Sequence, residues 1–422
     1  MSSGGRRPSV LVIGAGVYVC GRGRSGFGTV LPTLVQAHAE GLIGELAVAA
    51  TSPQGIAAVR EKLAGLNARL GTRVALRTYP EGRSKDALAY RQALEELPRP
   101  ACAVVVVPDH LHAPIAADVI KAGLHLLVVK PLAPTVAEAS ALIELAKARR
   151  VYGAVDFHKR FDEANLLARQ ALADGRLGEL RHISVDYGQR RDIRGAFEGW
   201  IRHTNIFQYL GVHYVDLIAF LTGAQPVRVL ATGQPRERAA QGLWQLDAIQ
   251  AVIEWEGTGP GRTFTSTIAT NWTEAERSSA MSTQAISLVG TRGRLDSDQK
   301  RRGVQLATEE GVEDPNPYFS QLYRSAGGEM SVEGYGPRSI RQFLRDVQSL
   351  LEEGCSIEEL ASTRPSFQQA LVSTAVIEAV NKSLAAGEEW VDVGLETATP
   401  RASRRVRRAA RSAPRETVVT SP

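Results

Sequence analysis

A single lysine follows a buried strand at a place where parallel sheets bind ligands. Residues 101–132 read ACAVVVVPDHLHAPIAADVIKAGLHLLVVKPL, and the apolar runs at 104–107 and 124–129 predict two buried strands. The helical spacing of residues 114–122 between them completes a strand–helix–strand unit. Ligands of a parallel sheet collect at the carboxyl ends of its strands, so we expect Lys130 to direct a cation at a ligand.

A second group of chemically capable side chains is the arginine-rich stretch at residues 188–204, GQRRDIRGAFEGWIRHT. Guanidinium groups bind carboxylates, phosphates and diphosphates through paired hydrogen bonds. An indole ring can stack on a sugar or a base. Arg191, Arg202 and Trp200 are therefore candidate contacts for an anionic substrate. A solvated basic loop would have the same composition, and the sequence leaves both interpretations open.

Two glycines open a turn that is typical of dinucleotide binding. The first apolar strand runs into Gly14-Ala15-Gly16. The first glycine permits a tight turn, and the second lets the backbone approach a pyrophosphate at a helix N-terminus. Val19 replaces the third glycine of the pattern, and helical spacing resumes only near Thr29. We expect an enlarged phosphate-binding loop before the first helix, and a flexible surface loop is the alternative.

The end of the second predicted strand, residues 46–50, bears on the choice of cofactor. Sites selective for NAD place an Asp or Glu there to bind the ribose 2′-hydroxyl, whereas Thr51 and Ser52 follow this strand. Arg60 and Lys62 lie on the next predicted helix and would suit a 2′-phosphate. The expected cofactor is therefore NADP or NAD, with NADP favoured unless an acid from elsewhere in the chain reaches the ribose.

The composition indicates a globular protein of the cytoplasm. Apolar residues make up 44% of the 422 residues, and no apolar run is long enough to span a membrane. Three scattered cysteines give neither a disulfide framework nor a metal-binding spacing. Seven arginines and one glutamate after residue 400 exceed the whole chain's net charge of +5, so the rest is near neutral. We therefore expect no metal, no nucleic acid and no membrane as partners.

The pattern of elements changes near residue 150. Before it, apolar strands alternate with helices, which predicts a doubly wound parallel sheet. After it, strands with a period of two are predicted at 180–187, 227–232, 248–255, 264–271 and 285–289. We therefore predict an α/β protein with a Rossmann domain at 9–150 and an α+β domain with a large, open, mostly antiparallel sheet at 151–396. A disordered basic tail is predicted at 397–422.

Four motifs in this order resemble the Gfo/Idh/MocA oxidoreductases. They are Gly14-Ala15-Gly16, VVVPDHLHAPIAADVIKAGLHLLVVKPL, DFHKRFDEAN with the following GRLGEL, and GVHYVDLIAFLTG. The resemblance covers roughly residues 9–396. It implies the same two-domain fold, and it implies nicotinamide-dependent hydride transfer on a sugar, a cyclitol or a sugar derivative. A homodimer or homotetramer is expected, because such an open sheet usually packs against another copy.

The resemblance also assigns roles to individual residues. Lys130 matches the lysine between nicotinamide and substrate hydroxyl, and His213 matches the helix histidine that acts as acid or base. Lys130, His213 and Tyr209 are the expected catalytic residues. The expected cofactor contacts are Gly14, Gly16, Val17, Thr51, Ser52, Pro108, His112, Lys130, Pro131 and His158. The expected substrate contacts are Lys130, Arg191, Trp200, Arg202, Tyr209 and His213.

Several positions carry an alternative at this level. His112 could instead cap or pack a helix, and Arg160 is expected in a structural ion pair. Val129 replaces the glutamate that precedes the family's lysine, and Tyr209 stands where several relatives have an aspartate four residues before the histidine. His213 would then act alone or with the Tyr209 hydroxyl. A non-catalytic nucleotide-binding regulator, or an enzyme using transient oxidation for elimination or hydrolysis, remain the alternative functions.

Overall fold

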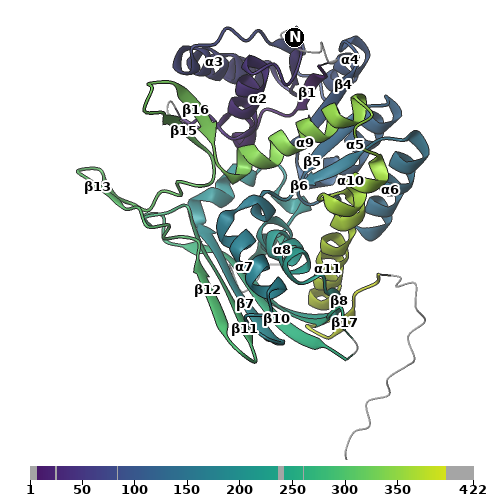
Figure 1. The fold of residues 1–422 in the computed structure, drawn as a ribbon, viewed down its shortest axis with the longest axis vertical. Helices are drawn as coiled ribbons and strands as arrows, with labels where there is room; N and C mark the ends of the chain where they lie inside the picture. The colour runs from purple at the N-terminus through teal and green to yellow at the C-terminus, as the bar shows by residue number, and fades with distance from the viewer. Residues whose placement is uncertain (1–6, 24–25, 83, 236–241, 260, 396–422) are drawn as a thin grey trace, which may run out of the picture.

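The computed structural model describes residues 7–23, 26–82, 84–235, 242–259 and 261–395 (Figure 1). The basic tail predicted at 397–422 lies outside the described residues. Within the described residues, no helix is long and apolar enough to cross a membrane. Two sheets dominate the molecule, and the predicted α/β fold class is confirmed.

The N-terminal sheet is parallel and has six strands in the order β3-β2-β1-β4-β5-β6. Its strands are short and almost entirely buried, which explains their continuous apolar sequences. The last strand lies just beyond the expected domain boundary at residue 150. The strands are β1 (Ser9–Ile13), β2 (Leu46–Ala49), β3 (Arg77–Tyr79), β4 (Ala101–Val105), β5 (His125–Val129) and β6 (Gly153–Asp156).

Helices cover both faces of this sheet. The first is a single turn, α1 (Val17–Cys20), so the glycine-rich loop follows a helix and does not precede it as predicted. Helix α6 begins after its N-cap residue Thr135, whose hydroxyl accepts a hydrogen bond from the Glu138 N–H. The other helices are α2 (Val30–Ala39), α3 (Pro53–Leu70), α4 (Ala89–Glu96), α5 (His112–Lys121) and α6 (Val136–Arg149).

The face of the N-terminal sheet that carries α2 and α3 is completed by residues from the far end of the chain. α9 (Tyr335–Leu351) buries Ile340, Phe343 and Val347 in the same core as the strand residues Val10 and Val12. The short α10 (Ile357–Thr363) follows and begins at a capping box. The N-terminal domain is therefore not a continuous stretch of chain, which the sequence-based boundaries did not anticipate (Figure 1).

The second sheet has the strand order β12-β11-β7-β10-β9-β8-β17. All neighbouring strands are antiparallel except β7 and β10, which pair in parallel. The sheet is thus mostly antiparallel, as predicted. Its strands are β7 (Leu180–Arg190), β8 (Gln225–Pro235), β9 (Leu246–Glu256), β10 (Thr263–Glu274), β11 (Ser282–Gly290), β12 (Arg294–Asp298) and β17 (Val391–Asp392).

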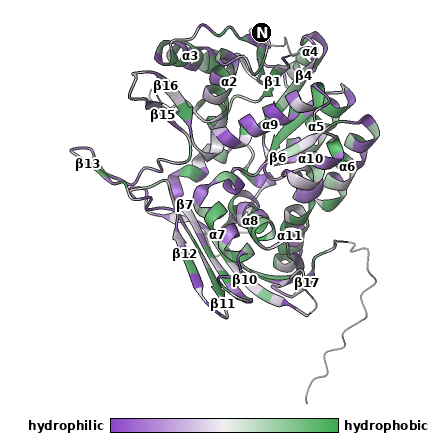
Figure 2. Cartoon of the chain, in the orientation of Figure 1, coloured by the Kyte–Doolittle hydropathy of each residue, from purple (hydrophilic) through white to green (hydrophobic). Residues whose placement is uncertain are grey.

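Three helices pack on the inner face of the second sheet, where apolar side chains of alternate strand positions are buried (Figures 1 and 2). They are α7 (Glu163–Ala173), α8 (Val212–Thr222) and α11 (Phe367–Ala385). α8 is preceded by a π-helical turn, Phe207–Gly211, which widens the helix where the candidate site residues lie. The remaining strands form two hairpins, β13 (Leu306–Thr308) with β14 (Gly311–Glu313), and β15 (Gln321–Arg324) with β16 (Met330–Glu333).

Candidate functional site

The turn after β1 has the geometry that a dinucleotide requires. Gly14 has φ 121°, and a Cβ added there would lie 1.9 Å from the Val106 carbonyl oxygen, so only glycine fits. A Cβ added at Gly16 would meet no atom within 4 Å, and Val17 next to it is exposed. Open space in front of a helix N-terminus suits a pyrophosphate. These residues therefore fit an NAD-type cofactor.

The basic residues that favoured NADP are engaged elsewhere. The Lys62 ammonium donates to the carbonyl oxygens of Gly23 and Gly26 and lies 5.3 Å from the centre of the Phe27 ring, so it holds the glycine-rich loop. Arg60 donates to the Thr78 hydroxyl at 2.6 Å. Lys62 is therefore committed to the loop, whereas Arg60 is exposed and keeps further N–H donors.

The two residues after β2 occupy an accessible corner of the sheet edge. Thr51 is exposed. The Ser52 hydroxyl accepts the Gly55 N–H at 3.2 Å and begins α3. Asp86 comes close to the same corner, because its backbone N–H donates to the Thr51 carbonyl oxygen at 3.0 Å. An acidic residue thus lies next to the end of β2, although it comes from the loop after β3.

Lys130 follows β5 directly and points toward the π-helical turn of the second domain. Its ammonium donates to the Tyr209 carbonyl oxygen at 2.5 Å and lies 3.9 Å from the centre of the Tyr209 ring. Burial lowers the pKa of Lys130 to about 8, while the carboxylates of Asp109 and Asp156 favour its charged form. Tyr209, predicted as a partner of His213, is thereby placed against the lysine.

His213 lies in the first turn of α8 and is buried. Its ring is 4.9 Å from the His158 ring and 6.2 Å from the Tyr187 ring, measured between centroids. Burial, and secondarily the charge of Lys130, hold the pKa of His213 well below its usual value. The imidazole is therefore neutral at physiological pH, and a neutral imidazole can accept a proton.

His158 and Asp156 follow β6 at the same sheet edge as Lys130. The Asp156 carboxylate is buried and accepts hydrogen bonds from the hydroxyls of Tyr18 at 2.6 Å and Ser339 at 2.7 Å. Burial raises the pKa of Asp156 and lowers that of His158. The strand ends of β5 and β6 therefore bring a lysine, an aspartate and a histidine to one edge, opposite His213.

The loop between β4 and α5 packs behind this edge. His112 is fully buried, with Nδ1 2.6 Å from the Pro131 carbonyl oxygen and Nε2 2.9 Å from the Val107 carbonyl oxygen. Both ring nitrogens thus face backbone, which is the packing alternative left open by the sequence. Pro108 is half-buried at the start of the loop, and Pro131 is buried. His112 holds the segment that carries Lys130 in place.

A buried ion pair supports the helix of His213. Arg160 donates to Asp216 through Nε at 2.8 Å and Nη2 at 2.5 Å, and both side chains are buried. The Arg160 guanidinium also lies 5.1 Å from the centre of the Phe220 ring. The predicted structural ion pair of Arg160 is confirmed. Its role is to fix α8, and hence His213, against the segment after β6.

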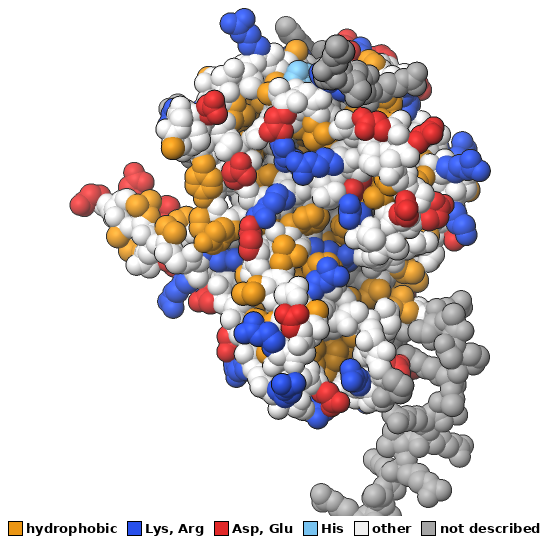
Figure 3. All heavy atoms as spheres, viewed as in Figure 1, with side chains coloured by type: hydrophobic (Ala, Val, Ile, Leu, Met, Phe, Trp, Pro, Cys, Tyr) orange, Lys and Arg blue, Asp and Glu red, His pale blue; other side chains and the backbone are white. Residues whose placement is uncertain are grey.

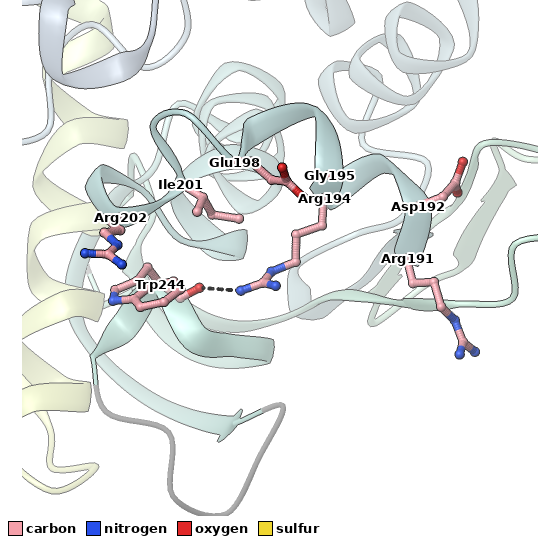
Figure 4. A pocket seen from close by; sticks show the side chains of 8 residues that line it. All are labelled: Arg191, Asp192, Arg194, Gly195, Glu198, Ile201, Arg202 and Trp244. Carbon is pink, nitrogen blue, oxygen red and sulfur yellow. Dashed lines mark hydrogen bonds between the residues drawn. The ribbon is translucent and has the colours of Figure 1, made fainter.

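The arginine-rich stretch lines two adjoining pockets of about 420 and 260 Å³ (Figure 4). The guanidinium of Arg202 stacks over the Trp244 ring at 5.5 Å, and Arg194 donates to the Trp244 carbonyl oxygen at 3.4 Å. Arg191 borders both pockets and is exposed. Trp200 instead packs edge-on against Phe197, so Trp244 supplies the indole that was predicted at Trp200.

Two aromatic rings, those of Trp272 and Tyr209, lie between the smaller pocket and Lys130. Trp272 lines the smaller pocket, and its ring centre is 6.1 Å from that of Tyr209. Tyr209 in turn carries the Lys130 ammonium on its face. A ligand in the smaller pocket would therefore be separated from the lysine by little more than these two rings.

Two further residues of the site were missed from the sequence. Asp109 is buried and accepts from the Thr204 hydroxyl at 2.9 Å and the Gln208 amide at 2.8 Å. Lys159 is buried and donates to Gln284 and Gln299 of the second sheet. Burial lowers the pKa of Lys159 to about 7. The available signal was position, because each follows a buried parallel strand within a few residues.

No group of three or more His, Cys, Asp or Glu side chains in the described part of the chain is arranged to hold a metal ion. The side chains gathered at this sheet edge include two ammonium groups, two imidazoles and two carboxylates, namely Lys130, Lys159, His158, His213, Asp109 and Asp156. Such a set can move protons and stabilise charge on oxygen.

Comparison with known proteins gives matches to two family models. One, described as "Oxidoreductase family, NAD-binding Rossmann fold", matches residues 10–157, and the other, "GFO/IDH/MocA C-terminal domain", matches residues 165–296. Inositol 2-dehydrogenase of Rhizobium meliloti is 23% identical over 287 residues, which span 67% of this chain and 78% of that protein. Levoglucosan dehydrogenase of Pseudarthrobacter phenanthrenivorans is 26% identical over 366 residues, which span 79% and 90%.

A solved structure shares the whole architecture. An inositol dehydrogenase homolog from Azotobacter vinelandii, complexed with NADH and myo-inositol, superposes with a TM-score of 0.65 at 19% sequence identity. The superposition covers 92% of this chain and 98% of that chain. At this level of identity the similarity shows a common fold.

Proposed function

The chain belongs to the GFO/IDH/MocA family of NAD-binding oxidoreductases, and from this premise we propose that Lys130 and His213 stabilise the charge and accept the proton when an alcohol of its substrate is oxidised. The enzyme transfers hydride between a nicotinamide cofactor and a CH–OH group of a sugar or cyclitol. One observation carries the residue assignment: an ammonium from the first domain and a neutral imidazole from the second lie at the same edge of the parallel sheet.

The two groups divide the chemistry of the alcohol oxygen. When the O–H bond breaks, the neutral His213 takes the proton. The Lys130 ammonium stabilises the negative charge that develops on the oxygen, and the Tyr209 carbonyl and ring hold that ammonium in place. The nicotinamide supplies the acceptor for the hydride that leaves the carbon. Gly14, Gly16 and Val17 would hold the cofactor.

We infer a preference for NAD over NADP. Arg60 and Lys62 are both engaged in hydrogen bonds, and Asp86 lies beside Thr51 at the end of β2. The Asp86 Oδ1 atom accepts the Leu88 N–H at 2.7 Å, and we place its other oxygen near the cofactor ribose, where the charge would repel a 2′-phosphate. The Michaelis constant for NAD is expected to be the lower one, and Asp86→Asn should narrow the difference. A Michaelis constant for NADP below that for NAD would contradict this preference.

The arginine pocket supports an anionic group on the substrate. Arg191 and Arg202 are exposed at its wall, and Trp244 offers a flat apolar surface beside Arg202, with Arg191 at the opposite side (Figure 4). Together these suit a sugar that carries a carboxylate, a phosphate or a diphosphate. Trp272 lines the smaller pocket and packs against Tyr209, which in turn contacts Lys130, so these two rings lie between the pocket and the lysine.

The activity is tested by a panel of alcohols with purified protein. Myo-inositol, levoglucosan, a uronic acid, a sugar phosphate and a nucleotide sugar are each incubated with NAD and with NADP, and reduced cofactor is followed by absorbance. We expect turnover on at least one member. Nucleotide binding without turnover on any member, in either direction, would favour the regulatory alternative. Release of a cleaved product without net reduction of the cofactor would favour elimination or hydrolysis.

We also infer a homo-oligomer located in the cytoplasm. β13 and β14 form an arm that stands out from the body and exposes Leu306 and Val312, and Figure 3 shows apolar side chains along it. Exposed apolar side chains on a protruding hairpin suit contact with another copy. Analytical sedimentation of the wild type and of a Leu306→Ser, Val312→Ser double variant tests this arm. The mass of the variant is expected to shift toward that of the monomer.

A further inference from the structure

The two imidazoles of the site, His158 and His213, form a pair, of which the proposed chemistry uses only His213. His158 belongs to the 3₁₀ segment after β6, and His213 belongs to α8, yet their ring centres are 4.9 Å apart. The Nδ1 atom of each is buried and has no hydrogen-bond partner within the described structure. Two neutral, adjacent imidazoles with unfilled nitrogens can share a single added proton.

A carboxylate lies next to the His158 ring of this pair. The Oδ2 atom of Asp156 is 4.0 Å from Nδ1 of His158. Hydrogen bonds from Tyr18 and Ser339 fix both oxygens of Asp156, which prevents the carboxylate from turning away. Asp156 is in register with Val129 on the neighbouring strand, one residue before Lys130. The acid is therefore built into the same sheet edge as the lysine.

The charges around the pair explain why it needs this carboxylate. The groups that face His158 are Tyr18 from α1, Lys130 after β5, Asp156 at the end of β6, Lys159 beside it, His213 from α8 and Tyr335 from α9. His213 additionally faces Tyr187 from β7. The only negative charge in this set is Asp156. When His213 gains a proton, its positive charge is repelled by Lys130 and Lys159. The counter-charge is Asp156, which lies beside His158.

We propose that His158 and Asp156 hold the proton that His213 removes from the substrate alcohol. This rests on the proposed function of Lys130 and His213. In the oxidation, the alcohol O–H bond breaks and its proton passes to His213, while the hydride leaves the carbon for the nicotinamide. The proton is then shared with His158, whose positive charge is balanced by the Asp156 carboxylate. The alcohol is oxidised and the nicotinamide is reduced, so the step needs no further reactant. His158 and Asp156 are positioning residues.

The first test does not depend on turnover. Full-length protein labelled in its histidine rings is titrated by NMR, with no substrate present. In the wild type, the signals of His158 and His213 should move together over the same pH range. Asp156→Asn removes the counter-charge from the protonated pair, so the shared midpoint should fall by about one pH unit. His213 titrating at an unchanged midpoint in wild type, Asp156→Asn and His158→Asn would overturn the proposal.

The second test follows kcat/KM against pH with NAD and the most active alcohol of the panel. The acidic limb reports the proton that must be absent before the reaction. In Asp156→Asn this limb should move to lower pH, and kcat should fall about tenfold with a KM for NAD close to wild type. A mere loss of structure would raise the KM for NAD as well. An acidic limb and a kcat that stay as in the wild type would overturn the proposal.

The chain offers a matched control and a second variant. His110 and His203 form another stacked imidazole pair, 4.1 Å apart, and His203 is exposed. His203→Asn should leave the acidic limb and the NMR midpoints of His158 and His213 unchanged. If Asp156→Asn does not fold, Tyr18→Phe removes the donor from the Asp156 oxygen nearest His158, which strengthens the counter-charge, so the shared midpoint should rise. A panel with no turnover would refute the proposed function, whereas the NMR titration would still decide on the pair.

Discussion

The proposed reaction centre and the arginine pocket both gather basic side chains, but in opposite surroundings. Lys130, His158 and His213 are enclosed between the domains, and burial moves the pKa of each away from its usual value. The pocket is open, and Arg191 and Arg202 at its wall are exposed. Enclosed charges alter reactivity, whereas solvated charges mainly attract a ligand. Changes at the centre should therefore affect kcat, and changes at the pocket should affect KM.

The largest effect is expected from removing the ammonium of the centre. Lys130→Ala should lower kcat by about 10²- to 10³-fold, the size found when one group that stabilises a developing oxyanion is deleted. Affinity for NAD, measured by fluorescence titration, should stay close to wild type because the phosphate turn is untouched. The control is Lys121→Ala on the exposed face of α5, which should change neither value. A Lys130→Ala enzyme with wild-type kcat would remove the distinction between the two regions.

The next largest effect is expected from breaking the buried ion pair of Arg160 and Asp216, which fixes the helix of His213. Asp216→Asn leaves the buried Arg160 guanidinium without its charged partner, so the free energy of unfolding should fall by about 3–5 kcal/mol. Urea unfolding measures this value. Glu179 forms an exposed ion pair with Arg181. Glu179→Gln should lower the free energy of unfolding far less, since exposed ion pairs contribute about 0–1 kcal/mol. Equal losses in the two variants would show that burial does not separate these regions.

The pH dependence of kcat sharpens the comparison further. The pKa of Lys130 is lowered to about 8, so its ammonium is intact below that pH and is lost above it. The rate of oxidation should therefore fall above pH 8, by about tenfold for each further unit. Lys130→Arg keeps a positive charge at all these pH values, and in that variant the alkaline limb should disappear even though kcat is lower. A limb that persists in Lys130→Arg belongs to another group.

The smallest effect is expected in the pocket. Arg202→Ala should raise the KM for an anionic alcohol about threefold to fivefold and leave kcat unchanged, because an exposed charge pair contributes up to about 1 kcal/mol. Steady-state kinetics with a uronic acid and with uncharged myo-inositol separate the two cases. Arg181→Ala, at the far end of β7, serves as the control. An equal change in KM for the uncharged alcohol would show that the pocket does not recognise charge.

Most of the N-terminal domain could be predicted from the sequence, because its signals are local. Continuous apolar runs marked the buried strands. The structural ion pair of Arg160 was also predicted correctly. The family and the hydride-transfer activity were also identified correctly, since four motifs in order are specific.

What the sequence could not provide depends on contacts between distant segments. Lys62 was assigned to a cofactor phosphate, whereas it holds the loop at Gly23 and Gly26, which only the folded chain brings together. Tyr209 was placed beside His213 by ideal helical spacing, but the π-helical turn directs its carbonyl and its ring toward Lys130. The pairing of His158 with His213 likewise joins two elements more than fifty positions apart.

The return of α9 to the N-terminal sheet has a consequence for how the protein is made. During synthesis the first 157 residues leave the ribosome long before α9. The part of the sheet face that packs against Ile340, Phe343 and Leu344 is therefore at first exposed to solvent. That face can be sealed only when about 350 residues have been translated. The N-terminal domain expressed alone would expose apolar surface, whereas nascent chains long enough to include α9 would gain resistance to protease.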